Sequence, residues 1–387
     1  MPNNNRNPIR TALVGCGKVG HTHAQALRSL SEFAAVCDQD ASRASAFAEK
    51  YGVRSYTDLP TMLTDAQVGL LSVCTPHPVH AESIVIAAES GVHVLTEKPL
   101  APDLQGCDRS IQACRKNGVK LGVISQRRLY QPVVRMRQAI DQGKIGQPVL
   151  VTLTVMGWRD ENYYKMDAWR GKWISEGGGV LVNQTVHQLD LFQWLMGPID
   201  ELFGYWENLN HPYIEVEDTA IAVVRFKNGG LGQILVSNSQ KPGFYGKIHV
   251  HGSNGASVGA QTEGGSPFVA GVSTEVEPPI NDIWTIPGEE QLLPDWQEQD
   301  RHFARTHDIM SYFHQLQIED MLKAIILDRE PMVSGEEGRK SVEIFTGIYR
   351  SQRDHTPIKF PLLAEPDRED YDGRLSHVPL SHRSIQS

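Results

Sequence analysis

The sequence predicts an α/β protein, with a doubly wound parallel sheet in its N-terminal part and an α+β domain with a large, mostly antiparallel open sheet after it. Two observations predict this fold class. Short apolar runs alternate with helical stretches up to residue 125, which is typical of a parallel sheet covered by helices. From residue 149 onward, long β-rich runs and hairpin turns replace this alternation. The length of 387 residues fits two domains.

The composition is that of a globular protein and argues against several classes of function. The formal net charge is −9 and no basic cluster occurs, which argues against nucleic-acid binding. No apolar run is long enough to cross a bilayer, and Met1–Arg6 lacks the apolar stretch of a secretory signal. The five cysteines form no CxxC pair and are interpreted as reduced thiols, so a cytoplasmic location is expected.

The expected elements follow from apolar periodicity and turn residues. In the first half, strands are expected at 10–14, 33–37, 68–75, 92–95 and 120–125, and helices at 21–30, 41–51, 79–90, 102–117 and 131–142. In the second half, strands are expected at 149–155, 220–226, 231–237, 247–251 and 256–259, and helices at 309–328 and 338–352. The stretch 264–281 is rich in Gly and Pro and is expected to be a loop.

A glycine motif, Gly15-Cys16-Gly17-Lys18-Val19-Gly20, stands between the first strand and the first helix, and the second strand ends at Asp38. Glycines there permit a tight turn and the close approach of a pyrophosphate to the helix N-terminus. Asp38 lies near the ~20-residue spacing at which an acid binds the ribose hydroxyls. The motif alone also occurs as a structural turn, but its flanks favour nucleotide binding. Asp38 would repel a 2′-phosphate and Gln39 offers no cation, so NAD is expected rather than NADP.

The strand at 92–95 ends in Glu97-Lys98-Pro99. The carboxyl ends of strands in an open parallel sheet line the ligand crevice. Lys98 would bring a positive charge and three donors to that crevice. The alternative is that Glu97 and Lys98 simply solvate the strand end. Thr75, Pro76 and His77 end another strand beside the expected cofactor, and His80 is either a further ligand or a surface group at a helix start.

A second informative stretch is Gly177–Leu191, in which three glycines precede a helix. Asn183 and His187 are four residues apart and are expected to project together. A histidine is suited to move a proton near neutral pH, although a helix histidine also commonly bonds a backbone carbonyl. The expected buried face of the helix consists of Leu181, Leu189, Phe192 and Leu195.

Taken together, four motifs resemble the glucose–fructose oxidoreductase/inositol dehydrogenase/rhizopine-catabolism (Gfo/Idh/MocA) family of NAD(P)-dependent sugar oxidoreductases. These are Gly15–Gly20, Thr75-Pro76-His77-Pro78-Val79-His80, Glu97-Lys98-Pro99 and Gly177–Asp190, of which Glu97-Lys98-Pro99 is the most specific. The resemblance covers residues 8 to 362. It implies an NAD-binding Rossmann domain at 8–127, a substrate-binding and oligomerisation domain at 128–362, and a polar tail at 363–387.

The resemblance also implies catalytic roles. Lys98 is expected to hydrogen-bond the reacting hydroxyl, and His187 to act as acid and base. Asn183 stands where an Asp is usual, which puts in doubt how protons are shared at the site. Tyr163 and Trp158 are expected to line the sugar site, although they, with Tyr164, could equally form a packed aromatic cluster.

The expected cofactor contacts come partly from the motifs and partly from the resemblance. They are Gly15, Gly17, Lys18, Val19, Gly20, Asp38, Thr75, Pro76, His77, His80, Glu97, Lys98, Gln126, Trp169 and Arg170. His77 replaces a more usual Asn. No metal site is expected, because His21 and His23 are two residues apart on a helix and face apart. The resemblance further implies a cis bond between Lys98 and Pro99, and a homodimer or homotetramer formed through the C-terminal sheet.

The expected activity is transfer of a hydride between NAD and a secondary hydroxyl of a small molecule, namely a sugar, glycoside or cyclitol. Two other readings stay open. One is an NAD-dependent glycosidase that oxidises its sugar transiently. The other is a non-catalytic protein that senses NAD and sugar.

Overall fold

A computed structural model describes residues 9–262, 278–365, 372 and 374. The chain divides into two compact units. The first consists of residues 1–101, 105–126 and 309–339, and the second of residues 102–104, 127–308 and 340–387. The expected linear boundaries, 8–127 and 128–362, therefore do not describe the division, because the segment 309–339 returns to the first unit.

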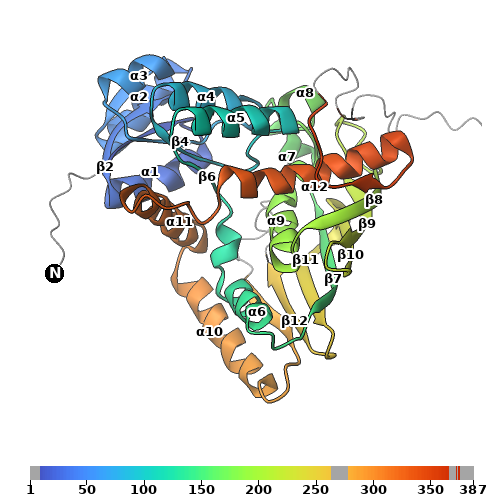
Figure 1. Ribbon diagram of the computed structural model, residues 1–387. Coiled ribbons are helices and arrows are strands. Elements are labelled where there is room, and N and C mark those ends of the chain that lie inside the picture. The colour runs from blue at the N-terminus through green and yellow to red at the C-terminus, as the bar shows by residue number, and fades with distance from the viewer. Residues whose placement is uncertain (1–8, 263–277, 366–371, 373, 375–387) are drawn as a thin grey trace, which may run out of the picture. The chain divides into compact units, whose positions relative to one another are not determined.

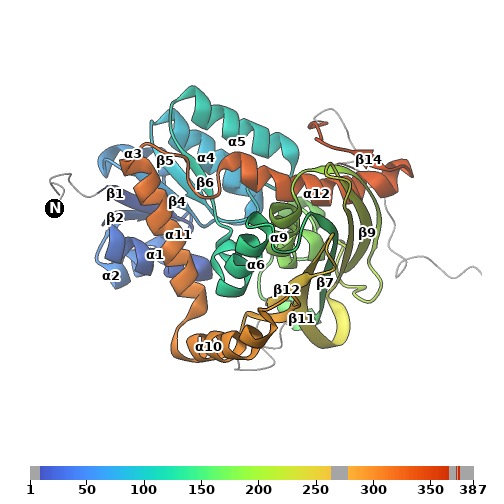
Figure 2. The same cartoon turned by 60° about the horizontal axis from the view of Figure 1, so that its bottom comes forward.

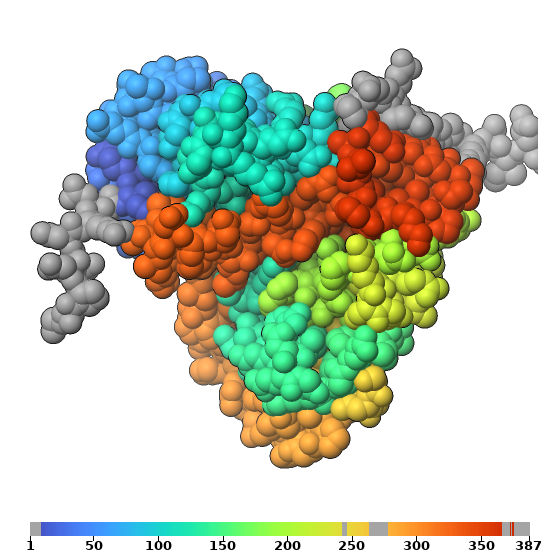
Figure 3. Space-filling model, viewed as in Figure 1, coloured from blue at the N-terminus to red at the C-terminus, as the bar shows by residue number. Residues whose placement is uncertain are grey.

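The reason for this return is apolar packing. Ile318, Met321 and Leu322 of α11 (Ile309–Ile326) share a core with Leu13 and Leu70 of the N-terminal sheet. Figure 3 shows the orange segment bordering the blue surface formed by N-terminal residues. Sequence periodicity predicted the helix, but it could not predict which core the helix would join.

The first unit contains six parallel strands in the order β3-β2-β1-β4-β5-β6. Their bounds are β1 Arg10–Val14, β2 Glu32–Cys37, β3 Arg54–Tyr56, β4 Leu70–Val73, β5 His93–Thr96 and β6 Leu121–Val123. This confirms the predicted doubly wound parallel sheet. The short β3 was not predicted, because three residues carry too little periodicity.

Helices cover both faces of this sheet. Their bounds are α1 Lys18–Leu30, α2 Ala41–Tyr51, α3 Leu59–Asp65, α4 His80–Glu89 and α5 Leu104–Lys116, with short turns η1 His77–Val79 and η2 Gln126–Leu129. Figures 1 and 2 show α1 and α11 on one face and α4 and α5 on the other. The carboxyl ends of the strands are thus left as the edge at which loops can carry functional groups.

The second unit contains eight strands in the order β13-β12-β11-β7-β10-β9-β8-β14. Their bounds are β7 Pro148–Trp158, β8 Ile199–Glu207, β9 Thr219–Phe226, β10 Leu231–Ser237, β11 Ser239–Gly252, β12 Ser257–Thr262, β13 Ile280–Trp284 and β14 Ile358–Lys359. Among the described strands of this sheet, only β7 and β10 pair in parallel, so the mostly antiparallel sheet and the β9–β10 hairpin are confirmed. The expected loop at 264–281 is wrong at its end, where Ile280 and Asn281 belong to β13; residues 263–277 lie outside the described residues.

Side chains alternate across β9, as expected for a sheet with one covered face. Ala220, Ala222 and Val224 are buried, whereas Ile221 and Val223 are 49% and 59% exposed. The other exposed large apolar residues on neighbouring strands are Val149, Leu150, Tyr205 and Leu231. An apolar surface of this kind on a sheet is characteristic of an interaction face.

The helices of the second unit are mostly short. They are α6 Gln131–Asp141, α7 Glu161–Lys165, α8 Trp173–Glu176, η3 Val180–Gln184, α9 Val186–Met196, η4 Glu290–Leu292 and α10 Leu293–Thr306, and α12 Gly335–Asp354 continues from the first unit into the second. Helix α9 packs on β7 and β11, and most of its residues are buried. Among the described residues, no helix combines the length and the apolar character needed to cross a membrane.

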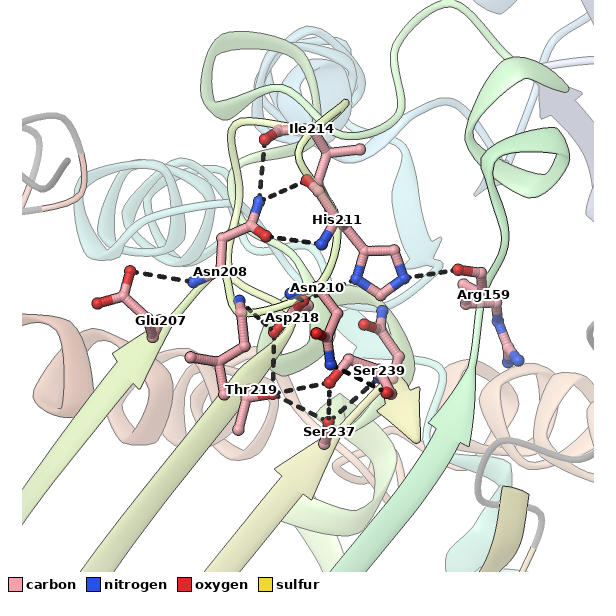
Figure 4. A network of polar contacts seen from close by, with 12 residues as sticks. Arg159, Glu207, Asn208, Asn210, His211, Ile214, Asp218, Thr219, Ser237 and Ser239 are labelled. Carbon is pink, nitrogen blue, oxygen red and sulfur yellow. Dashed lines mark hydrogen bonds and ion pairs between the residues drawn. The ribbon is translucent and has the colours of Figure 1, made fainter. Parts of the chain in front are cut away.

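A buried polar network anchors the loop between β8 and β9 (Figure 4). His211 Nδ1 lies 2.7 Å from Asp218 Oδ2, and His211 Nε2 lies 2.7 Å from the Arg159 carbonyl oxygen. Asn208 Nδ2 donates to the carbonyl oxygens of His211 and Ile214. Because every one of these contacts joins the loop to itself or to the end of β7, the network fixes the position of Arg159.

Part of the polar tail is docked. The Arg374 side chain is fully buried and donates to the carbonyl oxygens of Pro102 and Gly177, and its guanidinium lies 4.6 Å from the centre of the Tyr349 ring. Asp372 accepts a hydrogen bond from Arg350. Buried hydrogen bonds thus hold Asp372 and Arg374 of the expected polar tail. Residues 366–371, 373 and 375–387 lie outside the described residues.

Candidate functional site

The glycine motif has the steric features that a dinucleotide turn requires. Gly15 has a φ of +96°, and a Cβ there would lie 2.6 Å from the Cys74 carbonyl carbon. A Cβ at Gly20 would lie 2.5 Å from the Gly15 oxygen, whereas one at Gly17 would meet nothing within 4 Å. Gly17 is the N-cap of α1, and its helix start has no side-chain cap. Lys18 and Val19 follow as the first helical residues, so this N-terminus suits an anionic phosphate.

Asp38 is held beside this turn. Its carboxylate is buried at the end of β2 and accepts hydrogen bonds from the backbone N–H groups of Cys16 (2.9 Å) and Asp40 (3.0 Å). Arg43 Nη1 lies 3.7 Å from Asp38 Oδ2. Sequence reasoning considered only Gln39 as a possible cation and missed Arg43, which reaches back from the first turn of α2.

Buried polar atoms at the strand ends test whether NAD fits this unit. Within the described part of the chain, Thr75 Oγ1 and Gln126 Oε1 are buried and have no hydrogen-bond partner. Orphaned buried oxygens of this kind are costly unless a ligand or water satisfies them. Both residues were predicted to contact the cofactor, and both lie in segments that follow strands of the parallel sheet, Thr75 after β4 and Gln126 after β6. The residues present therefore fit the cofactor.

Two histidines follow β4. His80 is fully buried, with Nδ1 2.8 Å from the Pro99 carbonyl oxygen and Nε2 2.8 Å from the Thr75 carbonyl oxygen. It therefore joins the segments that follow β4 and β5, and it is not a surface group. His77 begins η1 beside the exposed Pro76 and is buried.

The carboxylate of Glu97 is enclosed by two histidines. Its Oε1 lies 3.0 Å from His23 Nε2 and 3.3 Å from His314 Nε2, while its Oε2 accepts from the Lys98 backbone N–H at 3.2 Å. Burial would raise the pKa of Glu97, but the hydrogen bonds from the two imidazoles hold it well below its usual range. Glu97 is thus a buried anchor directly before Lys98.

The surroundings of this anchor clarify two expectations. His23 Nδ1 lies 2.7 Å from Ser72 Oγ, whereas His21 stacks on Phe47, so His21 and His23 do face apart as predicted. The Lys98–Pro99 bond is cis, as the resemblance implied. Lys98 itself is partly exposed.

The glycine-rich stretch of the second unit ends in an irregular helix. A Cβ at Gly179 would collide with the Glu217 carbonyl oxygen, so this close approach requires glycine. A π-helical turn, Val180–Gln184, precedes α9, and the two are separated by Thr185. The expected single helix is therefore wrong: Asn183 lies in the π turn and His187, which is buried, lies in α9. All four residues of the predicted apolar face are buried.

Tyr163 lies at the centre of a polar cluster in the second unit. Its hydroxyl oxygen accepts from Arg170 Nη1 (2.6 Å), Gln184 Nε2 (3.1 Å) and Asn183 Nδ2 (3.4 Å). The Arg170 guanidinium also lies 4.6 Å from the centre of the Trp169 ring. Four residues predicted separately, Tyr163, Trp169, Arg170 and Asn183, are thus brought together, and Gln184 is an addition that sequence reasoning missed although it adjoins Asn183.

The other predicted aromatic residues have different surroundings. Tyr164 accepts a hydrogen bond from Asn238 and packs edge-on against His211, so it belongs to the packed side of the cluster. Trp158 lies at the end of β7, with Lys241 Nζ 4.2 Å from its ring centre. Tyr163 therefore has the surroundings of a site residue and Tyr164 those of a core residue.

Two buried glutamates that were not predicted lie near this cluster. Glu176 accepts from Asn183 Nδ2 (2.5 Å) and from the Gly171 N–H (2.5 Å). Glu217 accepts from the N–H groups of Gly179 (2.8 Å) and Leu181 (3.0 Å) and from the Tyr349 hydroxyl (2.9 Å). Burial raises the pKa of each carboxyl to about 7. The only signal in the sequence was that Glu176 directly precedes the three glycines.

Comparison with known proteins agrees with these features. Residues 9–125 match the family model for the oxidoreductase family with an NAD-binding Rossmann fold, and residues 133–258 match the GFO/IDH/MocA C-terminal domain. Myo-inositol 2-dehydrogenase of Thermotoga maritima is 30% identical over 254 residues, which are 64% of this chain and 74% of that protein. D-glucoside 3-dehydrogenase of Escherichia coli is 28% identical over 252 residues, 58% of this chain and 68% of that protein.

A solved structure gives the same relationship over almost the whole chain. The WlbA dehydrogenase from Bordetella pertussis, crystallised in complex with NADH and UDP-GlcNAcA, is 29% identical with a TM-score of 0.81, and the match covers 93% of this chain and 100% of that one. The resemblance seen in the four motifs is thus confirmed over both units. With an N-terminal unit built to hold NAD, this chain belongs to the Gfo/Idh/MocA family of oxidoreductases.

Proposed function

We propose that this protein is an NAD-dependent dehydrogenase acting on a secondary hydroxyl of a sugar, glycoside or cyclitol. The observation that carries the proposal is the pair of proton-handling residues at motif positions of the family, Lys98 after β5 and His187 in α9. The named functions of the relatives, an inositol dehydrogenase and a glucoside dehydrogenase, support this substrate class. The polar cluster around Tyr163 supports it as well, since amide and guanidinium groups bind hydroxyl-rich ligands.

The chemistry divides into three parts. The Lys98 ammonium hydrogen-bonds the reacting oxygen and stabilises the negative charge that develops on it. His187 accepts the hydroxyl proton, so the C–O bond gains double-bond character as the hydride leaves the carbon. NAD, when bound, supplies the hydride acceptor. The Glu97 anchor limits the freedom of the Lys98 backbone and so contributes orientation.

A nucleotide-linked sugar acid is a second candidate substrate. The observation that favours it is the WlbA dehydrogenase structure, because that match spans nearly all of this chain and that structure holds UDP-GlcNAcA. The two candidates share the reacting group, a secondary ring hydroxyl, and differ in what is attached to the sugar.

The experiment that tests the proposal is a substrate panel read by NADH absorbance. It contains free sugars, alkyl glycosides, inositols and UDP-linked hexuronates, each offered with NAD and separately with NADP. NADH formation with one class identifies the substrate. Hydrolysis of a glycoside with tightly held NAD and no net NADH would indicate the glycosidase reading instead, and binding without turnover would indicate the sensor.

We also propose that copies of the chain associate through the second sheet, in the cytoplasm. The exposed Ile221 and Val223 on β9 support the association, and five buried free thiols support a reducing compartment. The homo-oligomer is tested by light scattering coupled to gel filtration. A Val223→Asp variant should elute as a smaller species than the wild type, and an unchanged mass would exclude this face.

A further inference from the structure

Asn183 occupies the position at which the family resemblance implies an Asp, so a carboxylate is missing there. The structure shows a carboxylate directly behind it. Glu176 at the end of α8 is buried, and its Oε1 lies 2.5 Å from Asn183 Nδ2. Both residues belong to the second unit. The inference drawn from this contact rests on the proposed function.

The contact determines which atom Asn183 can offer to a ligand. While Glu176 is ionised, its carboxylate only accepts hydrogen bonds and therefore requires the amide NH2 group to face it. The same NH2 group also faces the Tyr163 hydroxyl, at 3.4 Å. The other branch of the amide is a carbonyl oxygen with two lone pairs, which accepts but cannot donate. In this orientation Asn183 resembles an Asp in its hydrogen bonding, although it carries no charge.

The side-chain amide of Gln184 is oriented in the same way as that of Asn183. Its Nε2 donates to the Tyr163 hydroxyl at 3.1 Å. Its Oε1 is buried and, within the described part of the chain, has no hydrogen-bond partner. A buried acceptor of this kind calls for a donor from outside the protein chain. Two adjacent side chains thus present oxygens to donors, and hydroxyl groups of a polyol are donors of the required kind.

The second buried glutamate provides the contrast. Glu217 is as buried as Glu176, but its partners are the backbone of the glycine-rich turn and the Tyr349 hydroxyl. None of these is a side chain at the predicted site. Glu217 therefore holds the fold of the turn, whereas Glu176 holds the orientation of a site residue.

We propose that Glu176 is a positioning residue of the substrate site. By binding the NH2 group of Asn183, it orients the Asn183 oxygen to accept a hydrogen bond from a substrate hydroxyl, in place of the carboxylate that the family resemblance implies at that position. The ligand class that this arrangement selects is a compound with neighbouring hydroxyl groups that donate to the oxygens of Asn183 and Gln184.

A direct consequence concerns Asn183→Asp. From the sequence alone, this change is expected to raise activity or shift the pH optimum by restoring a charge beside His187. In the structure it would place a second carboxylate against Glu176, and two carboxylates at such a distance cannot both ionise. The charged and titratable groups that also face Glu176 are Arg170, Tyr163, Tyr164 and Glu217. The single variant is therefore expected to lose activity.

The test is a double-mutant cycle in the full-length protein with NAD. Its members are Glu176→Gln, Asn183→Asp and the double variant, which exchanges the carboxylate and the amide while keeping one hydrogen bond between them. Glu217→Gln is the matched control, since it neutralises an equally buried carboxylate with no site partner. For each protein, kcat, KM, the pH profile, NAD affinity and the unfolding midpoint are measured with the substrate found in the panel.

We expect each single variant to lose about tenfold or more in kcat/KM and the double variant to recover most of that loss. A recovery of tenfold corresponds to about 1.4 kcal/mol of coupling. The acid limb of the pH profile should be lost in Glu176→Gln. In Glu217→Gln it should persist and move only slightly to lower pH, because the Glu217 charge is a minor cause of the raised pKa of Glu176. NAD affinity should be unchanged in all four proteins.

Three results would separate this inference from the proposed function. Coupling in the unfolding midpoint but additive losses in kcat/KM would overturn the positioning role and leave the dehydrogenase in place. If no member of the panel is oxidised but calorimetry shows that an inositol or methyl glucoside binds with the same coupling, the dehydrogenase fails and the inference stands. A wild-type protein that neither binds nor oxidises these compounds would overturn both.

Discussion

Each of the two units buries a glutamate next to a residue proposed to act on substrate, and the two glutamates behave in opposite ways. In the first unit Glu97, which precedes Lys98, faces two imidazoles, and its pKa is held well below the usual range. In the second unit Glu176, behind Asn183, faces an amide and a backbone N–H, and its pKa is raised to about 7.

The difference teaches that burial alone does not decide the charge of a carboxyl group. Both glutamates lose their contact with water, which favours the neutral acid. Glu97 accepts hydrogen bonds from two imidazoles that can carry a positive charge, and these outweigh the loss of hydration, whereas Arg170 near Glu176 does not offset its burial. Glu97 is therefore suited to a constant structural charge, whereas Glu176 is able to change its protonation near neutral pH. The predictions that follow are ways to break or sharpen this contrast.

The largest effect is expected from the two residues that we propose to handle the proton, of which Lys98 directly follows Glu97. Lys98→Met and His187→Ala should each lose on the order of 10²–10⁴ in kcat, because each removes one positioned proton-handling group. NAD affinity should persist, since neither residue is expected to contact the adenosine half of NAD. Steady-state kinetics and NAD titration check this, with circular dichroism as the control for folding. If His187→Ala keeps near-wild-type kcat, His187 is structural and the proton leaves through Lys98 or Tyr163.

Breaking the Glu97 cluster should cost the most stability. Glu97→Gln removes the negative charge between two buried imidazoles and replaces one acceptor oxygen with a donor NH2 group, so a loss of about 3–5 kcal/mol is expected. Urea unfolding measures it. Glu32→Gln is the control, because its pair with Arg10 is at the surface and should contribute less than about 1 kcal/mol. Equal losses of unfolding free energy in the two variants would mean that the buried cluster stabilises the protein no more than a surface ion pair does.

The buried glutamates of the two units should make stability depend on pH in opposite directions. A carboxyl group whose pKa is raised on folding stabilises the folded state at pH values below its unfolded pKa, which is near 4.5. The contributions of Glu176 and Glu217 are therefore lost as the pH rises from about 4.5 through about 7. Each shift corresponds to roughly 3 kcal/mol. The lowered pKa of Glu97 stabilises above about 4.5 and is lost as pH falls below that value.

Thermal melts across the pH range check this. Glu217→Gln should flatten the decline between pH values of about 4.5 and 7, and it should leave the acid side unchanged. A decline of the same steepness in the variant would show that the Glu217 carboxyl is already ionised in the folded protein at low pH.

A smaller effect is expected at the ribose site. Asp38→Ser should shift preference toward NADP by roughly tenfold or more, because Arg43 keeps only Asp40 of its two carboxylate partners and can meet a 2′-phosphate. Adding Gln39→Arg should increase the shift, and adding Arg43→Ala should cancel it. The ratio of kcat/KM for the two cofactors decides this. A wild type that prefers NADP would contradict the interpretation of Asp38.

Much of the nucleotide-binding unit was predictable from the sequence because its signals are local. A strand, a glycine turn, a helix and an acid lie within about thirty residues, and each follows from the shape of its own backbone. Gly15 and Gly20 show this most directly, since no side chain fits at either position. The β9–β10 hairpin was predictable for the same reason.

Other features depended on tertiary structure. The sequence by itself determined the two kinds of sheet, the NAD-binding turn and the candidates Lys98, Asn183 and His187. Only the fold decided that α11 joins the first unit, that His314 meets Glu97, and that Glu176 turns the amide of Asn183. These contacts join residues of different segments, and the periodicity within one segment does not predict its contacts with another. Hydrogen-bond direction and pKa depend on which groups share a buried space, and only the folded chain determines those neighbours.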